Sequence, residues 1–141
     1  MIDPNSTQKE QIKEKINLAN ENITLIEKNI NSLKYDKQQY ENMTNQINEV
    51  IKKLIESKKI DNSTKSQITK SLSGARQVLT VNEIANIVTE IDECILNLQE
   101  ILSKANTKIS GINNKISINQ SSLYCEQTKL DRLEREYRCL N

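Results

Sequence analysis

The chain has 141 residues, 35% of them hydrophobic, and a formal net charge of +1 from 20 basic and 19 acidic side chains. Its two Gly residues exclude sandwiches and barrels, which need frequent turns, and also Gly-rich phosphate loops. The absence of His removes the commonest general base and the commonest zinc ligand, and the balanced charge is not typical of a nucleic-acid-binding protein. The sequence therefore predicts an all-α protein that is not an enzyme and binds no cofactor, metal ion or nucleic acid.

The first six residues are set apart from the fold. Asp3-Pro4-Asn5-Ser6 is the peptide that adjacent BamHI and EcoRI restriction sites encode in one reading frame. Residues 1–6 are therefore interpreted as a cloning remnant, and the alternative is a native N-terminus that is disordered. A single helical domain is expected over residues 7–141.

A first long helix is expected over about residues 7–59. Apolar side chains recur there at alternating steps of four and three, which is the heptad spacing of a coiled-coil seam. The seam positions are Ile12, Ile16, Ala19, Ile23, Ile26, Ile30, Leu33, Lys37, Tyr40, Thr44, Ile47, Ile51 and Leu54. Only Lys37 and Thr44 interrupt the apolar row.

A different segment is expected over about residues 60–80, at the tip between two long helices. The polar cluster Asp61-Asn62-Ser63-Thr64 can end the first helix and cap a short one that runs to about Leu72. Ser73-Gly74 can then break the chain, because Gly tolerates the left-handed conformation that stops a helix. Thr80-Val81-Asn82-Glu83 has the form of a capping box and predicts that the next helix starts at Val81.

The heptad spacing returns in a second long helix, expected over about residues 81–140. Its seam positions are Ile84, Val88, Ile91, Ile95, Leu98, Leu102, Ala105, Ile109, Ile112, Ile116, Asn119, Leu123, Glu126, Leu130, Leu133, Tyr137 and Leu140. The polar residues in both seams either set the register of the helices or extend their side chains to solvent. Two helices of similar length around a central break predict a long antiparallel helical hairpin, a coiled coil within one chain.

Some apolar side chains lie off the seam. Ile87, Cys94 and Ile101 are seven residues apart on the second helix, and Leu18 and Leu25 have the same spacing on the first. A seam between two helices cannot cover them. Either a helix of another protein docks there, or the short central helix folds back over Ile87 and Cys94.

The three cysteines, Cys94, Cys125 and Cys139, form no metal-binding or redox motif. A sparse, odd set is typical of reduced thiols in the cytoplasm. No apolar run approaches the 18 residues of a membrane span, and no signal peptide is apparent. The expected location is the cytoplasm, with secretion together with a partner as an alternative.

Leu72-Ser73-Gly74 lies near the middle of the chain, between the two helices. A helical hairpin with a Trp-x-Gly or Leu-x-Gly turn resembles the small WXG-type (ESX) proteins of type VII secretion. The length and the Asn-, Lys- and Ile-rich coiled coil are more similar to the YwqH-like helpers encoded beside LXG toxins in Gram-positive bacteria. The Tyr-x-x-x-Asp/Glu export signal of many such proteins is missing, since Tyr137 is followed four residues later by Asn141.

The resemblance implies a targeting partner or chaperone that binds the helical N-terminal domain of a toxin, or another small helical helper, for export. Leu72 and Gly74 are then the turn motif, and Ile87, Cys94, Ile101, Leu18 and Leu25 are the expected partner-binding residues. The alternative is a self-associating structural or tethering coiled coil. The first predicts a hetero-oligomer, and the second predicts oligomers without a foreign partner.

Overall fold

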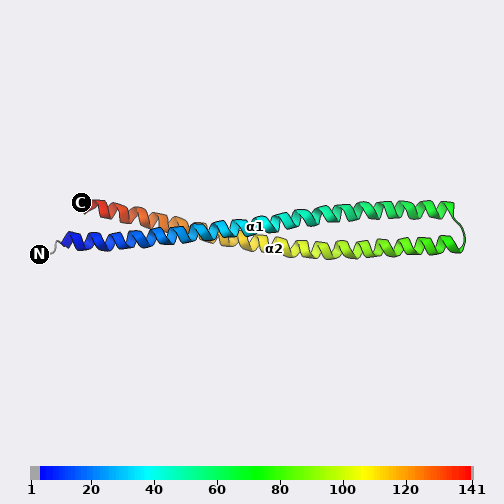
Figure 1. Ribbon diagram of the computed structural model, residues 1–141, viewed down its shortest axis with the longest axis horizontal. Helices are drawn as coiled ribbons and strands as arrows, with labels where there is room; N and C mark the ends of the chain where they lie inside the picture. The colour runs from blue at the N-terminus through cyan, green and yellow to red at the C-terminus, as the bar shows by residue number, and fades with distance from the viewer. Residues whose placement is uncertain (1–3, 141) are drawn as a thin grey trace. The chain divides into compact units, whose positions relative to one another are not determined.

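The computed structural model describes residues 4–140 and contains two helices, α1 (Pro4–Ser71) and α2 (Ala75–Cys139) (Figure 1). The two helices pack against each other, and residues 4–140 contain no strand. The predicted all-α helical hairpin is therefore confirmed. Helix α1 begins at Pro4, whose missing amide hydrogen and fixed φ suit the first turn of a helix. Of the six residues set apart in the sequence, residues 4–6 are thus helical, and residues 1–3 lie outside the described part.

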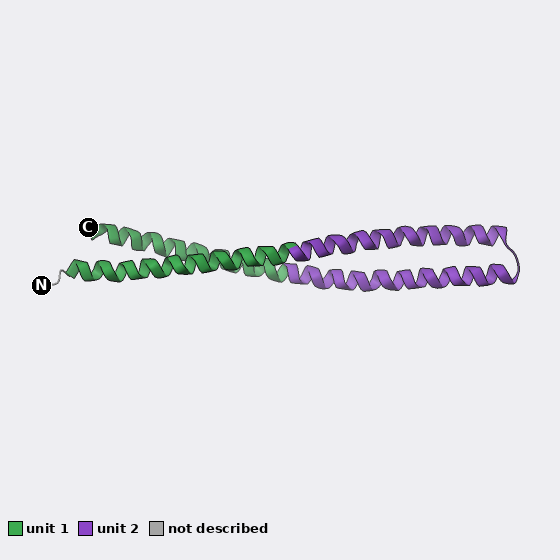
Figure 2. Ribbon diagram, in the orientation of Figure 1, with its two compact units in different colours: residues 1–38, 110–141 green, residues 39–109 purple. Residues whose placement is uncertain are grey.

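The chain divides into two compact units, each made from a segment of both helices (Figure 2). Unit 1 comprises residues 1–38 and 110–141, and unit 2 comprises residues 39–109 with the reversal of the chain. In each unit, the side chains that face the other helix are the ones at heptad spacing. Every seam position predicted from the sequence is buried or partly buried.

The most buried side chains are small or aliphatic. Ala19 is 1% exposed in unit 1 and Ala105 is 3% exposed in unit 2. Ile30, Ile116 and Leu133 complete the buried apolar set of the described residues. None of the large side chains among them is fully buried, because a pair of helices covers each seam residue from one side only. The seam is therefore the whole core of each unit.

The predicted tip segment, residues 60–80, is wrong in its boundaries. Helix α1 continues through Asp61-Asn62-Ser63-Thr64 to Ser71, and α2 starts at Ala75 instead of Val81. Asn, Ser and Thr only weakly disfavour a helix interior, and the seam spacing runs on through this part of α1. Its further seam positions, Lys58, Asp61, Lys65 and Ile68, are all partly buried. The capping-box pattern Thr80–Glu83 lies inside α2, where no cap is needed.

The reversal needs three residues, Leu72 to Gly74. The Leu72 amide donates the last bond of α1 to the Ile68 carbonyl (2.9 Å), and Gly74 has a φ of 76°. The last carbonyl groups of a helix lack partners within the helix. At the end of α1, the Thr69 carbonyl accepts a hydrogen bond of 2.7 Å from the side-chain amide of Gln77. Gly74 is the residue that permits this turn, because left-handed backbone is costly for other residues.

The two glycines give opposite predictions for substitution by Ala. Gly74→Ala should lower the free energy of unfolding by about 1–2 kcal/mol, because Ala is strained at positive φ. Gly111→Ala should raise it by about 0.5–1 kcal/mol, because Gly111 is helical and a Cβ there meets nothing within 4 Å. Urea unfolding monitored by circular dichroism measures both. Equal effects of the two changes would contradict the assigned turn.

The polar seam positions differ in how their polar atoms are satisfied. The Thr44 hydroxyl donates to the Glu41 carbonyl (2.8 Å), and the Asn119 amide donates to the Lys115 carbonyl (2.8 Å). Glu126 Oε2 is buried and has no hydrogen-bond partner. One interpretation of the polar seam residues is that their side chains extend to solvent. This is wrong for Glu126, whose Oε2 is buried, and for the buried Thr44.

Replacing Glu126 should stabilise unit 1. Glu126→Leu should raise the free energy of unfolding by about 1–3 kcal/mol, because it removes a buried, unsatisfied oxygen and restores an apolar seam position. Glu27→Leu, at an exposed position of the same unit, is the matched control and should change it by less than about 0.5 kcal/mol. Chemical unfolding of both variants tests this. A loss of stability in Glu126→Leu would show that the carboxylate has a structural role.

Candidate partner-binding surface

Unit 2 has an apolar row beside its closed seam. Ile87 and Ile101 are 48% and 47% exposed, and Cys94 is exposed between them. Each of the three immediately precedes a partly buried seam residue of α2, so they lie along one edge of the helix. The expectation that the central segment folds back over Ile87 and Cys94 is wrong, because that segment belongs to the continuous helix α1.

Helix α1 adds two apolar side chains to this edge. Met43 and Val50 also immediately precede seam residues, and Val50 is exposed. In an antiparallel helix pair, these positions of the two helices flank the seam on the same side. Tyr40, Met43, Ile101 and Ala105 line one groove of about 440 Å³ together with Lys104, Thr107 and Lys108. We call Met43, Val50, Ile87, Cys94 and Ile101 the apolar strip of unit 2.

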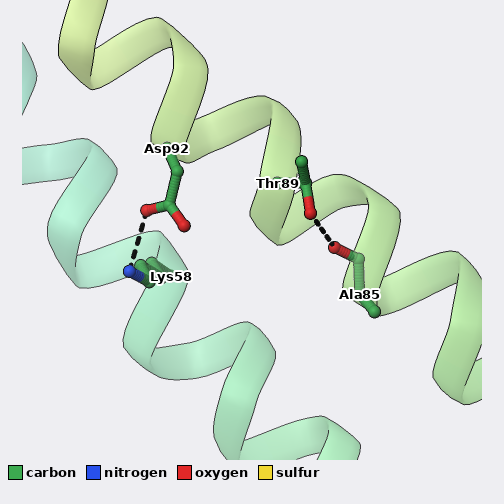
Figure 3. A network of polar contacts seen from close by, with 4 residues as sticks. All are labelled: Lys58, Ala85, Thr89 and Asp92. Carbon is green, nitrogen blue, oxygen red and sulfur yellow. Dashed lines mark hydrogen bonds and ion pairs between the residues drawn. The ribbon is translucent and has the colours of Figure 1, made fainter.

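The opposite edge of unit 2 is mostly polar. Lys58 Nζ of α1 lies 2.8 Å from Asp92 Oδ1 of α2, and on the same helix the Thr89 hydroxyl donates to the Ala85 carbonyl at 3.0 Å (Figure 3). The side chains of the ion pair are 37% and 46% exposed, so solvent screens it and it adds little stability. The positions that follow the seam residues on this edge include Asn48, Asn62, Gln99 and Asn106, and Ile55 and Ala85 are apolar exceptions. The contrast between the two edges singles out the apolar strip.

Two of the predicted partner-binding residues lie elsewhere. Leu18 and Leu25 are more than half exposed and belong to unit 1, whereas Ile87, Cys94 and Ile101 belong to unit 2. Unit 1 also has a groove of about 540 Å³ whose walls combine apolar, polar and charged side chains. Its lining residues are Gln8, Gln11, Ile12, Lys15, Arg132, Arg135, Glu136, Cys139 and Leu140. Neither Leu18 nor Leu25 lines it, so the five predicted residues form two separate sets.

The turn motif occupies the reversal itself. Leu72 is 43% exposed there, directly after α1, and Gly74 supplies the positive φ. Met43 and Val50 were not among the residues predicted from the sequence. The signal that identifies them is their seven-residue spacing, one position before the alternate seam residues Thr44 and Ile51. Leu18 and Leu25 instead precede the other set of alternate seam residues.

Other kinds of site find little support among the described residues. Over residues 4–140, no group of three His, Cys, Asp or Glu side chains is placed to hold a metal ion. All three cysteines are free and exposed. Neither helix has, within this range, an apolar stretch that could cross a membrane.

Comparison with protein-family models, with curated proteins and with solved structures gave no match to this chain. The function must therefore be inferred from the apolar strip and its surroundings.

The strip should be dispensable for folding. Ile87→Glu or Ile101→Glu should change the free energy of unfolding by less than about 1 kcal/mol, because nearly half of each side chain is already exposed. Ile91→Glu, in the adjacent seam, should lower it by about 3 kcal/mol or more, because it places a charge in the core of unit 2. Thermal and urea unfolding compare the three. Equal losses would mean that the strip is part of the core.

Proposed function

We propose that this chain is a non-enzymatic helical hairpin that binds a helical domain of another protein along the apolar strip of unit 2. The observation that carries the proposal is the row Ile87, Cys94 and Ile101, exposed together with Val50 beside a seam that is already closed, with the partly buried Met43 next to it. An apolar edge next to a helix seam is the pattern of a helix that packs against more than one neighbour.

The size of the strip favours a folded domain over a short peptide as the partner. Covering the remaining half of an Ile side chain contributes about 1 kcal/mol, so the strip supplies on the order of 4–5 kcal/mol. Association costs about 4–15 kcal/mol in lost translational and rotational freedom. A tight complex therefore requires a partner that contacts more of the surface than the strip alone, as a bundle of several helices can.

The resemblance to type VII secretion helpers gives the partner a chemical identity. In this proposal, it is the helical N-terminal domain of an LXG-type toxin, alone or with another small helical helper. The protein covers the apolar helix faces of that domain and presents it for export, either remaining in the cytoplasm or leaving with it. The mid-chain turn Leu72-x-Gly74, with its positive φ at Gly74, supports this assignment.

Co-expression with the N-terminal domain of an LXG toxin should give a complex that elutes as one species, with its mass measured by light scattering. Ile101→Glu should weaken binding at least tenfold, because it places a charge in the covered strip. Leu96→Glu is the matched control, because Leu96 is on the same helix, 65% exposed and outside the strip. Failure of toxin domain and sister helper to co-elute, or equal losses in the two variants, would refute the proposal.

The alternative, a self-associating structural tether, gives a different result in the same experiment. It predicts oligomers that grow with protein concentration and do not change when the toxin domain is added. The exposed apolar side chains of unit 1, Leu18 and Leu25, would then contribute to assembly. Substituting them with Glu would shorten such assemblies.

A further inference from the structure

On α2, the apolar residues of the strip are spaced symmetrically about Cys94. Ile87 precedes Cys94 by seven residues, and Ile101 follows it by seven. One row further from the seam, Glu83 lies eleven residues before Cys94 and Lys104 ten residues after it, with opposite charges. All five residues belong to α2 in unit 2, and Cys94, Ile87 and Ile101 are exposed.

We propose that the strip binds a second copy of the same chain, with the two α2 helices antiparallel about a twofold axis beside Cys94. Ile87 of one protomer then packs against Ile101 of the other, and the two Cys94 side chains meet at the axis. At 1.5 Å per residue, Ile87 and Ile101 are about 21 Å apart along the helix, and Glu83 and Lys104 about 32 Å apart. A self-complementary surface of this kind closes as a dimer and does not polymerise.

Charge determines the direction of the pairing. In the antiparallel arrangement, Lys104 of each protomer faces Glu83 of the other, and symmetry makes this contact twice. A parallel arrangement brings Lys104 against Lys104 and Glu83 against Glu83, which is repulsive. Lys104 Nζ also lies 3.5 Å from Glu100 Oε1, but these side chains are 76% and 68% exposed, so that pair does not compete strongly.

The dimer goes beyond the proposed function, because it covers the strip that the partner domain would use. A contact one helix wide and about 32 Å long is smaller than the interfaces of stable dimers. It therefore exchanges readily, and a domain that contacts more surface displaces the second copy. Loss of the dimer leaves partner binding possible, so the two proposals fail in different experiments.

Sedimentation velocity of the purified full chain alone, over a series of concentrations at low salt, tests the association. The wild-type chain and the Leu96→Glu control should show a monomer–dimer equilibrium, and Ile101→Glu should remain a monomer. Circular dichroism should give the same helix content for all three. A wild-type monomer at every concentration, or species larger than a dimer, overturns the proposal.

A charge exchange tests the orientation. Lys104→Glu should weaken the dimer about tenfold, because two attractive contacts become repulsive. The double variant Glu83→Lys/Lys104→Glu should recover the wild-type dissociation constant, since the charges are only exchanged. A double variant as weak as the single one overturns the antiparallel arrangement.

Selective crosslinking tests the position of the axis. A variant with Cys125→Ser and Cys139→Ser keeps Cys94 alone, and mild oxidation with diamide should convert it to a disulfide-linked dimer. The bond requires Cα atoms about 4.4–6.8 Å apart, which only residues near the axis satisfy. A variant that keeps Cys125 alone should remain uncrosslinked under the same conditions. Equal or reversed crosslinking of the two variants refutes the assigned axis.

Discussion

Burial of one heptad-spaced row of side chains against another is the interaction on which both units depend. The most buried residues, Ala19 and Ala105, are small and allow the helices to approach closely, while the larger Ile and Leu side chains stay partly exposed. Among residues 4–140, no third layer covers the seam of either unit, so neither helical segment has a core of its own. The same thinness leaves the edges of the seam open, and this is why a binding surface can lie directly beside the core.

The spacing of apolar residues predicted the helices and their contacting faces well, because heptad steps relate directly to helix geometry. It failed at the tip, where Lys58, Asp61 and Lys65 occupy the seam positions of α1. A polar residue there resembles a break in the pattern, although its methylene groups still pack and Lys58 reaches Asp92. The capping-box pattern at Thr80 is equally local, and such a pattern also occurs within a helix.

The candidate surface was only partly accessible from the sequence. Ile87, Cys94 and Ile101 share a seven-residue spacing on one helix, so the row is apparent without coordinates. Met43 and Val50 can be assigned to the strip only once the antiparallel arrangement of α1 and α2 is known, because it places the matching edges of the two helices on the same side of the seam. Leu18 and Leu25 show the converse, because a similar spacing grouped them with residues that belong to another unit. Spacing identifies a stripe on one helix, but the topology decides which stripes adjoin.

The three-residue reversal between Ser71 and Ala75 also constrains how the length of this protein can change. With no spare chain at the turn, the two helices cannot slide past each other without unwinding one of their ends. A single-residue insertion within α1 rotates the part on one side of it by about 100° and turns the seam away from α2. Lengthening or shortening is tolerated in whole heptads, and only if both helices gain or lose the same number at matching levels. Homologues of different length should therefore differ by paired blocks of seven residues.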